Sequence, residues 1–231
     1  ISLGGKKDVD KAVSAAKKAF ETWAFSKKEE RLDLLEKLYV VYKKRWAEMA
    51  KLISLEMGAP MKFSTEMQAA TGASHIKSFK NILKDFKFEK DLGEEKNNQK
   101  LLYEPKGVCA LITPWNWPIN QVNLKVIPAL ASACTVVLKP SEIAPLSSML
   151  LAEMIDEVKF PPGVFNLING DGAVTGDALT SHPDINMISF TGSTRAGALI
   201  SQNAAKDFKR ISLELGGKGA NIIFKDADSE A

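Results

Sequence analysis

Asn116 and Glu214 are the two residues whose types and neighbours best suit catalysis. Asn116 lies in the segment TPWNWP (113–118), where two prolines and two tryptophans stiffen the backbone. A rigid amide donor suits the negative oxygen that develops when a nucleophile attacks a carbonyl. Glu214 lies between apolar neighbours in LELGGK (213–218), where burial would suit a general base. The alternative is a buried carboxylate satisfied by backbone amides.

Lys139 and Glu142 frame a turn that contains Pro140. A lysine donor and a carboxylate acceptor at this spacing can hold ribose hydroxyls. The competing interpretation is an ordinary surface salt bridge, which contributes little to stability.

Two glycine-containing segments suit phosphate binding. The spacing of Gly170, Gly172 and Gly176 is a loosened dinucleotide fingerprint, and taken alone it is weak evidence. The segment TGST (191–194) stands between a predicted strand and a predicted helix, where free backbone amides and the helix dipole favour a pyrophosphate. Simple N-capping of that helix by Ser193 or Thr194 is an equally good interpretation.

Short β-branched runs alternate with helical periods in residues 94–231, which is typical of βαβ units with a parallel sheet. We expect strands at Val108–Ile112, Thr135–Leu138, Val164–Ile168, Met187–Phe190 and Asn221–Phe224. We expect helices at about Gln121–Ser132, Leu146–Val158, Thr175–Ser181 and Ala196–Lys206. The fold class is therefore α/β: a Rossmann-like, open, mostly parallel sheet with helices on both faces. Ligands bind beyond the carboxyl ends of such strands, where all the segments above lie.

An N-terminal helical segment precedes the sheet, and residues 1–93 are expected to be mainly helical. Asp8 is the expected N-cap of the first helix. A second, longer helix is expected from about Glu29 until Gly58 and Pro60, and a third over about 67–86. Leu101–Glu104 is a candidate strand outside the main sheet.

Composition excludes several function classes. The 31 basic and 28 acidic residues are interspersed, with a formal net charge of +3, so no nucleic acid partner is expected. No apolar run reaches the ~20 residues that cross a bilayer, so a cytoplasmic protein without membrane contact is expected. Cys109 and Cys134 lie in short apolar runs and are expected to be free, buried thiols. No metal site is expected.

Four motifs together resemble the aldehyde dehydrogenase superfamily, specifically its NAD(P)-binding portion. Pro-Trp-Asn-x-Pro, Lys-Pro-Ser-Glu, Phe-Thr-Gly-Ser-Thr-x-x-Gly and Glu-Leu-Gly-Gly-Lys occur here in the order and at intervals typical of that family. The resemblance extends from Asp8 to Ala231. It implies that residues 1–231 are an NAD(P)-binding domain, and that the enzyme oxidises an aldehyde to a carboxylic acid.

The resemblance also implies roles for individual residues. Asn116 would donate its amide to the aldehyde oxygen, and Glu214 would activate the water that hydrolyses a cysteine thioester. Lys139 and Glu142 resemble the adenosine-ribose contacts, and the Glu142 charge favours NAD over NADP. Trp115 and Ser193 resemble pyrophosphate contacts, and Gly172, Gly176 and Phe190 part of the adenine-side wall. The full set of implied cofactor-binding residues is Ile112, Thr113, Pro114, Trp115, Lys139, Ser141, Glu142, Gly172, Gly176, Phe190, Thr191, Gly192, Ser193, Leu215 and Gly216.

The helix after Asn116 lines the aldehyde tunnel in that family. Its inward candidates here are Trp117, Asn120, Gln121 and Leu124, and the two amides among them suggest a polar aldehyde. Lys125 on the same helix is either part of a proton path or a lysine that faces solvent.

One element of the family pattern is missing. The nucleophilic cysteine of the family lies in a Gly-Gln-x-Cys type of segment, which we expect beyond Ala231 together with the catalytic domain and the last strand of the oligomerisation hairpin. This stretch alone should then bind the cofactor without turnover, and the full-length enzyme should be a homo-dimer or homo-tetramer. Two alternatives stay open. One is a non-catalytic nucleotide-binding module or partner subunit, which a native mass of about 25.2 kDa would favour. The other is a relative that transfers the acyl group to coenzyme A, against which Glu214 argues.

Overall fold

A five-stranded parallel sheet forms the centre of the molecule in the computed structural model, which describes residues 1–92 and 99–228. The strand order is β5-β4-β3-β6-β7. The strands are β3 (Val108–Ile112), β4 (Thr135–Lys139), β5 (Phe165–Leu167), β6 (Met187–Thr191) and β7 (Arg210–Glu214). The chain runs outward from β3 to β5, then returns to the other side of β3 with β6. This reversal makes the β3–β6 boundary the switch point at which open α/β sheets bind ligands.

Strands β3 and β4 are buried along their whole length, which is why both appear in the sequence as continuous apolar runs. Their side chains alternate between the two faces of the sheet. Val108, Ala110 and Ile112 contribute to one apolar core, whereas Cys109 and Leu111 contribute to the other. The expected α/β fold with helices on both faces is confirmed.

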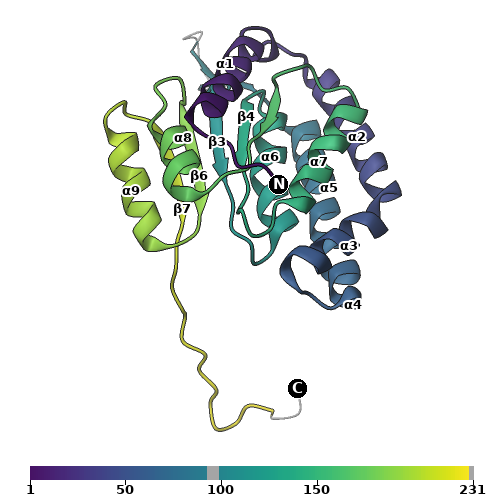
Figure 1. The fold of residues 1–231 in the computed structure, drawn as a ribbon. Coiled ribbons are helices and arrows are strands. Elements are labelled where there is room, and N and C mark those ends of the chain that lie inside the picture. The colour runs from purple at the N-terminus through teal and green to yellow at the C-terminus, as the bar shows by residue number, and fades with distance from the viewer. Residues whose placement is uncertain (93–98, 229–231) are drawn as a thin grey trace.

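Helices α1 (Lys6–Trp23), α8 (Asp177–Ser181) and α9 (Thr194–Ala205) cover the first face. Figure 1 shows α1 crossing in front of β3 and β4, with α8 and α9 beside it over β6 and β7. Val9, Val13 and Ala16 form the buried stripe of α1, at the three- and four-residue steps of an amphipathic helix.

Helices α6 (Pro118–Ala131) and α7 (Leu146–Glu157) cover the second face, and α2, α3 and α5 pack outside them. These outer helices span Lys28–Lys44, Trp46–Met57 and Ala69–Asp85. Polar contacts join this layer where the helices approach closely. The Tyr42 hydroxyl donates to the Ala69 carbonyl at 2.9 Å, and the Asn123 amide donates to the Gly72 carbonyl at 2.9 Å.

Three helix expectations differ from the structure. Gly5, not Asp8, is the N-cap of α1, and Asp8 instead accepts the Gly5 N–H at 3.0 Å from the third helical position. The long second helix is broken at Arg45 into α2 and α3, although it ends as expected at Gly58, whose φ of 74° is left-handed. The third helix begins with short turns, α4 (Met61–Phe63) and the π-turn η1 (Ser64–Gln68).

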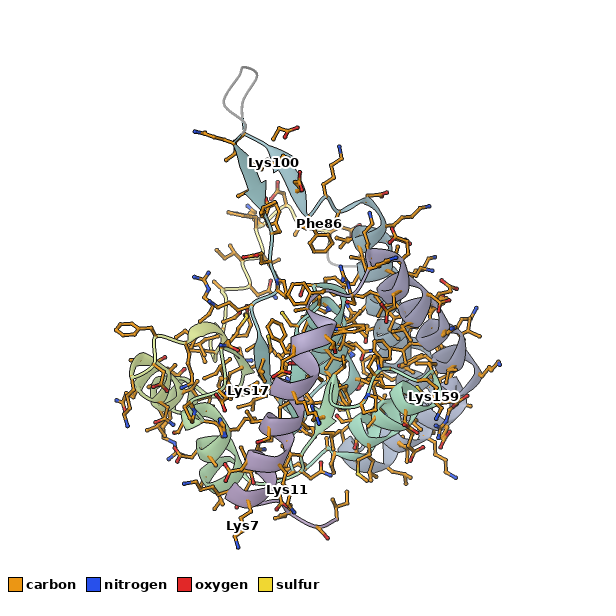
Figure 2. The ribbon with its side chains drawn as sticks, turned by 90° about the horizontal axis from the view of Figure 1, so that it is seen from above. Lys7, Lys11, Lys17, Phe86, Lys100 and Lys159 are labelled. Atoms are coloured by element: carbon orange, nitrogen blue, oxygen red, sulfur yellow. The ribbon has the colours of Figure 1, made fainter. Side chains whose placement is uncertain are left out.

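A two-stranded antiparallel hairpin stands apart from the main sheet, and Figure 2 shows it projecting from the body at Lys100. Its strands are β1 (Glu89–Asp91) and β2 (Lys100–Leu102). A strand outside the main sheet was expected at Leu101–Glu104. The strand exists, but it begins one residue earlier and ends two residues earlier. The expected change of pattern at residues 93 and 94 lies outside the described residues.

The strand expected at Asn221–Phe224 is wrong. These residues form no strand, and Ile222, Ile223 and Phe224 are at least 70% exposed in the extended tail of Figure 1. The position beside β6 is occupied by β7, paired from Arg210 to Glu214. An apolar run becomes a strand only where a partner offers hydrogen bonds, and the pattern of the run does not reveal the partner.

Candidate active and cofactor site

A cavity of about 610 Å³ lies beyond the carboxyl ends of β3, β4 and β6. We call it the strand-end cavity. The loops after these strands and the π-turn η2 (Gly172–Gly176) all contribute to its wall. The expected cofactor-binding residues that line it are Ile112, Thr113, Pro114, Trp115, Lys139, Ser141, Glu142, Gly172, Gly176, Phe190, Thr191, Gly192 and Ser193.

A neighbouring cavity of about 620 Å³ brings Asn116 and Glu214 together. Leu215 and Gly216, the remaining expected cofactor residues, also line it. The two cavities share five wall residues from the loops after β3 and β6: Pro114, Trp115, Thr191, Gly192 and Ser193. The Asn116 amide and the Glu214 carboxylate therefore both lie at the carboxyl ends of the strands, next to the strand-end cavity.

Lys139 is not part of an ordinary surface ion pair, because only 3% of its side chain is exposed. Its ammonium donates to the Pro140 carbonyl at 3.1 Å and lies 3.4 Å from a carboxylate oxygen of Glu142. Desolvation lowers the pKa of Lys139, although the neighbouring Glu142 opposes this shift. The arrangement leaves a buried donor and a half-exposed acceptor at the cavity wall.

Ser193 caps helix α9, since its hydroxyl oxygen accepts the Ala196 N–H at 3.2 Å. The N-capping interpretation of this segment is therefore correct, and it is compatible with the cavity because Ser193 lines both cavities. Gly192 permits a close approach: a Cβ there would lie 2.4 Å from the Phe190 ring. Ser193 and Ala196, at the start of α9, line the cavity, and the N-terminal end of a helix favours an anion.

Glu214 is exposed at the end of the edge strand β7, so its expected burial is wrong. Apolar neighbours in sequence did not bury it because side chains alternate along a strand, which turns Ile211 and Leu213 inward and Glu214 outward. Its backbone is nevertheless held, because the Gly192 N–H donates to the Glu214 carbonyl at 3.0 Å.

Lys125 is buried, which excludes the solvent-facing alternative. Its ammonium donates to the Ser189 hydroxyl at 3.0 Å, below the strand-end loops. Burial lowers the pKa of Lys125, and the Glu214 charge acts in the opposite direction.

Two of the four residues expected to line the aldehyde tunnel already have partners within the chain. Trp117 donates its indole N–H to the Thr71 hydroxyl at 3.2 Å, and Asn120 Oδ1 lies 2.8 Å from His75 Nε2. Leu124 is 43% exposed. With the Asn120 amide engaged by His75, Gln121 is the amide on which the case for a polar aldehyde rests.

Sequence reasoning missed one wall of the strand-end cavity. Helix α9 contributes Ala196, Leu199, Ile200 and Asn203, a helical stripe whose spacing could have revealed it. Asn203 also donates to the Asp177 carboxylate and the Thr180 hydroxyl, at 2.9 and 3.1 Å. The complete missed set is Ile143, Ala173, Asp177, Thr180, Ala196, Leu199, Ile200 and Asn203.

Cys109 and Cys134 are free and buried, as expected, and neither lines the two cavities. The neighbouring Cys134 thiol and burial raise the pKa of Cys109, whereas the Cys109 thiol lowers the pKa of Cys134 to about 6. Within residues 1–92 and 99–228, no cluster of His, Cys, Asp or Glu could hold a metal ion. No helix in the same ranges is long and apolar enough to cross a membrane.

The residues present fit a dinucleotide. The strand-end cavity is within the ~300–1,000 Å³ typical of ligand sites. Its wall consists of apolar residues, the N-terminal end of α9 and the Lys139–Glu142 pair. The buried hydroxyls of Thr113 and Thr191 have no hydrogen-bond partner among the described residues, so polar groups remain for a ligand.

The whole chain, residues 1–231, matches the family model of the aldehyde dehydrogenase family. It is 53% identical over its full length to a 3-succinoylsemialdehyde-pyridine dehydrogenase of a Pseudomonas species, and covers 48% of that protein. A putative aldehyde dehydrogenase of Staphylococcus epidermidis is 43% identical, again with 48% of its length covered. The chain thus spans about half the length of the curated relatives it matches.

Solved structures agree with this match. An aldehyde dehydrogenase of Bartonella henselae superposes with a TM-score of 0.96 at 60% identity, over 100% of this chain and 48% of that one. A mutant of aldehyde dehydrogenase C from Pseudomonas syringae, in complex with NAD+ and octanal, superposes with a TM-score of 0.94 at 47% identity. The match covers 98% of this chain and 46% of that one. With the family model matched along its whole length, this chain belongs to the aldehyde dehydrogenase family.

Proposed function

We propose that residues 1–231 form the NAD(P)-binding domain of an enzyme that oxidises an aldehyde to a carboxylic acid. The observation that carries the proposal is the adjacency of the two cavities: one fits a dinucleotide, and the other contains Asn116 and Glu214. Solved relatives with NAD+ bound support a nicotinamide cofactor. The exposed carboxylate of Glu142 supports NAD over NADP, because it would repel a 2′-phosphate.

In this proposal, the residues of the strand-end cavity hold the cofactor. Lys139 and Glu142 bind the adenosine ribose, and Trp115, Ser193 and the first turn of α9 bind the pyrophosphate. Gly172, Gly176 and Phe190 form part of the adenine side. When bound, NAD+ supplies the acceptor for the hydride that leaves the aldehyde carbon.

The chain's own residues then perform two tasks. Asn116 donates its side-chain N–H to the carbonyl oxygen and stabilises the negative charge that forms on attack by a cysteine thiolate. Glu214 accepts a proton from the water that hydrolyses the thioester, so that the carboxylic acid is released. Its position on an exposed strand end allows it to reach solvent water. The attacking cysteine is proposed to lie outside these 231 residues.

The exposure of the apolar residues Ile222, Ile223 and Phe224 supports the proposal that a further region of the protein packs against this tail. A module that only binds nucleotides would not need an oxyanion donor beside a carboxylate, which favours the enzyme over that alternative. The cytoplasmic location and the homo-dimer or homo-tetramer expected from the sequence stay predictions.

The proposal is tested by NADH formation from a panel of aldehydes with the full-length protein. Asn116→Ala should lower kcat by about 10²–10³-fold, which is typical for loss of an oxyanion donor, while the Kd of NAD+ stays unchanged. Asn81→Ala, an exposed substitution on α5, is the matched control. Full activity of Asn116→Ala would refute the oxyanion role, and failure of the wild type to reduce NAD+ with any aldehyde would refute the enzyme itself.

A further inference from the structure

The loop of residues 140–145 carries half of the proposed ribose site, because Glu142 lies on it. At its start the loop is anchored by strand β4, where the Lys139 carbonyl accepts the Thr113 N–H at 3.2 Å. Inside the loop, the Ala144 N–H closes a turn onto the Ser141 carbonyl at 3.1 Å. At its end the loop runs directly into helix α7, so the placement of Glu142 depends on how that helix begins.

Helix α7 has no cap of its own. Its N-cap residue is Pro145, no side chain from the adjacent sequence accepts its first N–H groups, and its first turn contains no acidic residue. The first N–H groups of a helix lack partners within the helix, and leaving them unsatisfied is costly. In most helices a local Ser, Thr, Asp or Asn provides the acceptor.

Here the acceptor is Glu56, which is 90 residues away in the sequence. Its carboxylate accepts the Leu146 N–H at 2.5 Å and the Ser147 N–H at 3.2 Å. Glu56 comes from the last turn of α3, in the outer helical layer. The carboxylate therefore joins that layer to the point where the ribose loop ends.

The contact places a charge where burial disfavours it. Desolvation raises the pKa of Glu56, and the hydrogen bonds from Leu146 and Ser147 only partly oppose that shift. At pH 7 the charged carboxylate therefore contributes less to the stability of the folded state than a protonated carboxyl group would. Its hydrogen bonds to Leu146 and Ser147 nevertheless fix the point at which the ribose loop ends.

We propose that Glu56 is a positioning residue for the cofactor: by capping α7 from α3, it holds residues 140–145 so that Glu142 faces the ribose. This inference rests on the proposed function, since it assumes that the strand-end cavity binds NAD+. Glu56 itself does not line that cavity, so it acts through the loop.

The test compares Glu56→Gln with Glu153→Gln in the full-length protein. Glu153 also joins α7 to the start of α3, through an exposed contact of 2.7 Å with Arg45, but it lies far along α7 from the loop. Glu56→Gln should raise the Kd of NAD+ about fivefold, equivalent to about 1 kcal/mol, because the amide offers the Leu146 and Ser147 N–H groups one acceptor oxygen where the carboxylate offers two. It should narrow the preference for NAD+ over NADP+ and leave kcat at saturating NAD+ within about twofold. Glu153→Gln should change none of these quantities.

Hydrogen exchange of the backbone amides of residues 141–144, 146 and 147 provides a readout that needs no cofactor. These amides should exchange faster in Glu56→Gln than in the wild type, and Glu153→Gln should leave them unchanged. Unaltered exchange, or unaltered NAD+ affinity with faster exchange, would overturn the positioning role of Glu56. Absence of NAD+ binding by the wild-type protein would instead overturn the proposed function, so the two failures are distinguishable.

Discussion

The ammonium of Lys125 on α6 donates a hydrogen bond of 3.0 Å to the hydroxyl of Ser189 on β6. This contact joins a helix on the second face to the strand that borders the switch point. It holds a positive charge inside the protein, where Glu214 is the charged group that counteracts the desolvation. The electrostatics of the site therefore involve a residue that lines neither cavity.

Lys125→Met should reduce the pH dependence of stability at alkaline pH. The folded pKa of Lys125 is lowered from 10.5, so between the lowered pKa and 10.5 the unfolded chain binds more protons than the folded one. Stability due to this group therefore rises with pH through that window and is lost as pH falls through it. Denaturant unfolding at several pH values gives the free energy of unfolding as a function of pH. In the alkaline window this free energy should rise less steeply with pH in Lys125→Met than in the wild type. Lys77→Met, an exposed substitution on α5, should keep the wild-type slope; equal slopes for all three proteins would contradict the shift.

Glu142→Ser should narrow the difference between NAD+ and NADP+ affinity in the full-length protein. The carboxylate at the cavity wall would repel a 2′-phosphate, and serine removes that charge while it keeps a hydroxyl. Titration of both cofactors measures the ratio. Glu104→Ser, which removes an exposed carboxylate outside the cavity, should leave the ratio unchanged. An unchanged ratio in Glu142→Ser would show that this carboxylate does not reach the ribose.

Glu214→Gln should separate the two phases of turnover in the full-length enzyme. Hydride transfer precedes hydrolysis, so the first burst of NADH should persist while the steady rate falls by about 10²–10⁴-fold, the typical effect of a lost general base. Rapid-mixing measurements of NADH resolve the two phases. The control is Ser212→Ala, an exposed neighbour on β7. Equal loss of burst and steady rate would remove Glu214 from the role of base.

Gly72→Ala should destabilise the helical layer by about 1–3 kcal/mol, the usual cost of overpacking. A Cβ at Gly72 would lie 2.3 Å from the hydroxyl oxygen of Tyr42 and 3.0 Å from Ile119, and both side chains are fully buried. Denaturant unfolding measures the loss. Ser74→Ala on the exposed side of the same helix should have little effect, and a Gly72→Ala protein as stable as the wild type would show that Tyr42 can move aside.

Much of the fold follows from local patterns. Strand β3 occupies the expected residues, Val108–Ile112, because a fully buried parallel strand must be apolar along its whole length. The expected binding segments share a wall because parallel strands end at one edge of the sheet. For the same reason, the sequence alone predicts that Asn116, which follows β3, lies near the other strand-end loops.

The rest depended on partners far away in the sequence. Whether Arg210–Glu214 or Asn221–Phe224 pairs with β6 was decided by hydrogen bonds to β6, and the exposure of Glu214 followed from its place on that edge strand. The burial of Lys125 required β6 beneath α6, and the cap of α7 required a carboxylate from α3. Sequence periodicity reports which side of an element is apolar, but only packing determines which polar group meets which, because such contacts join residues that chain spacing does not relate.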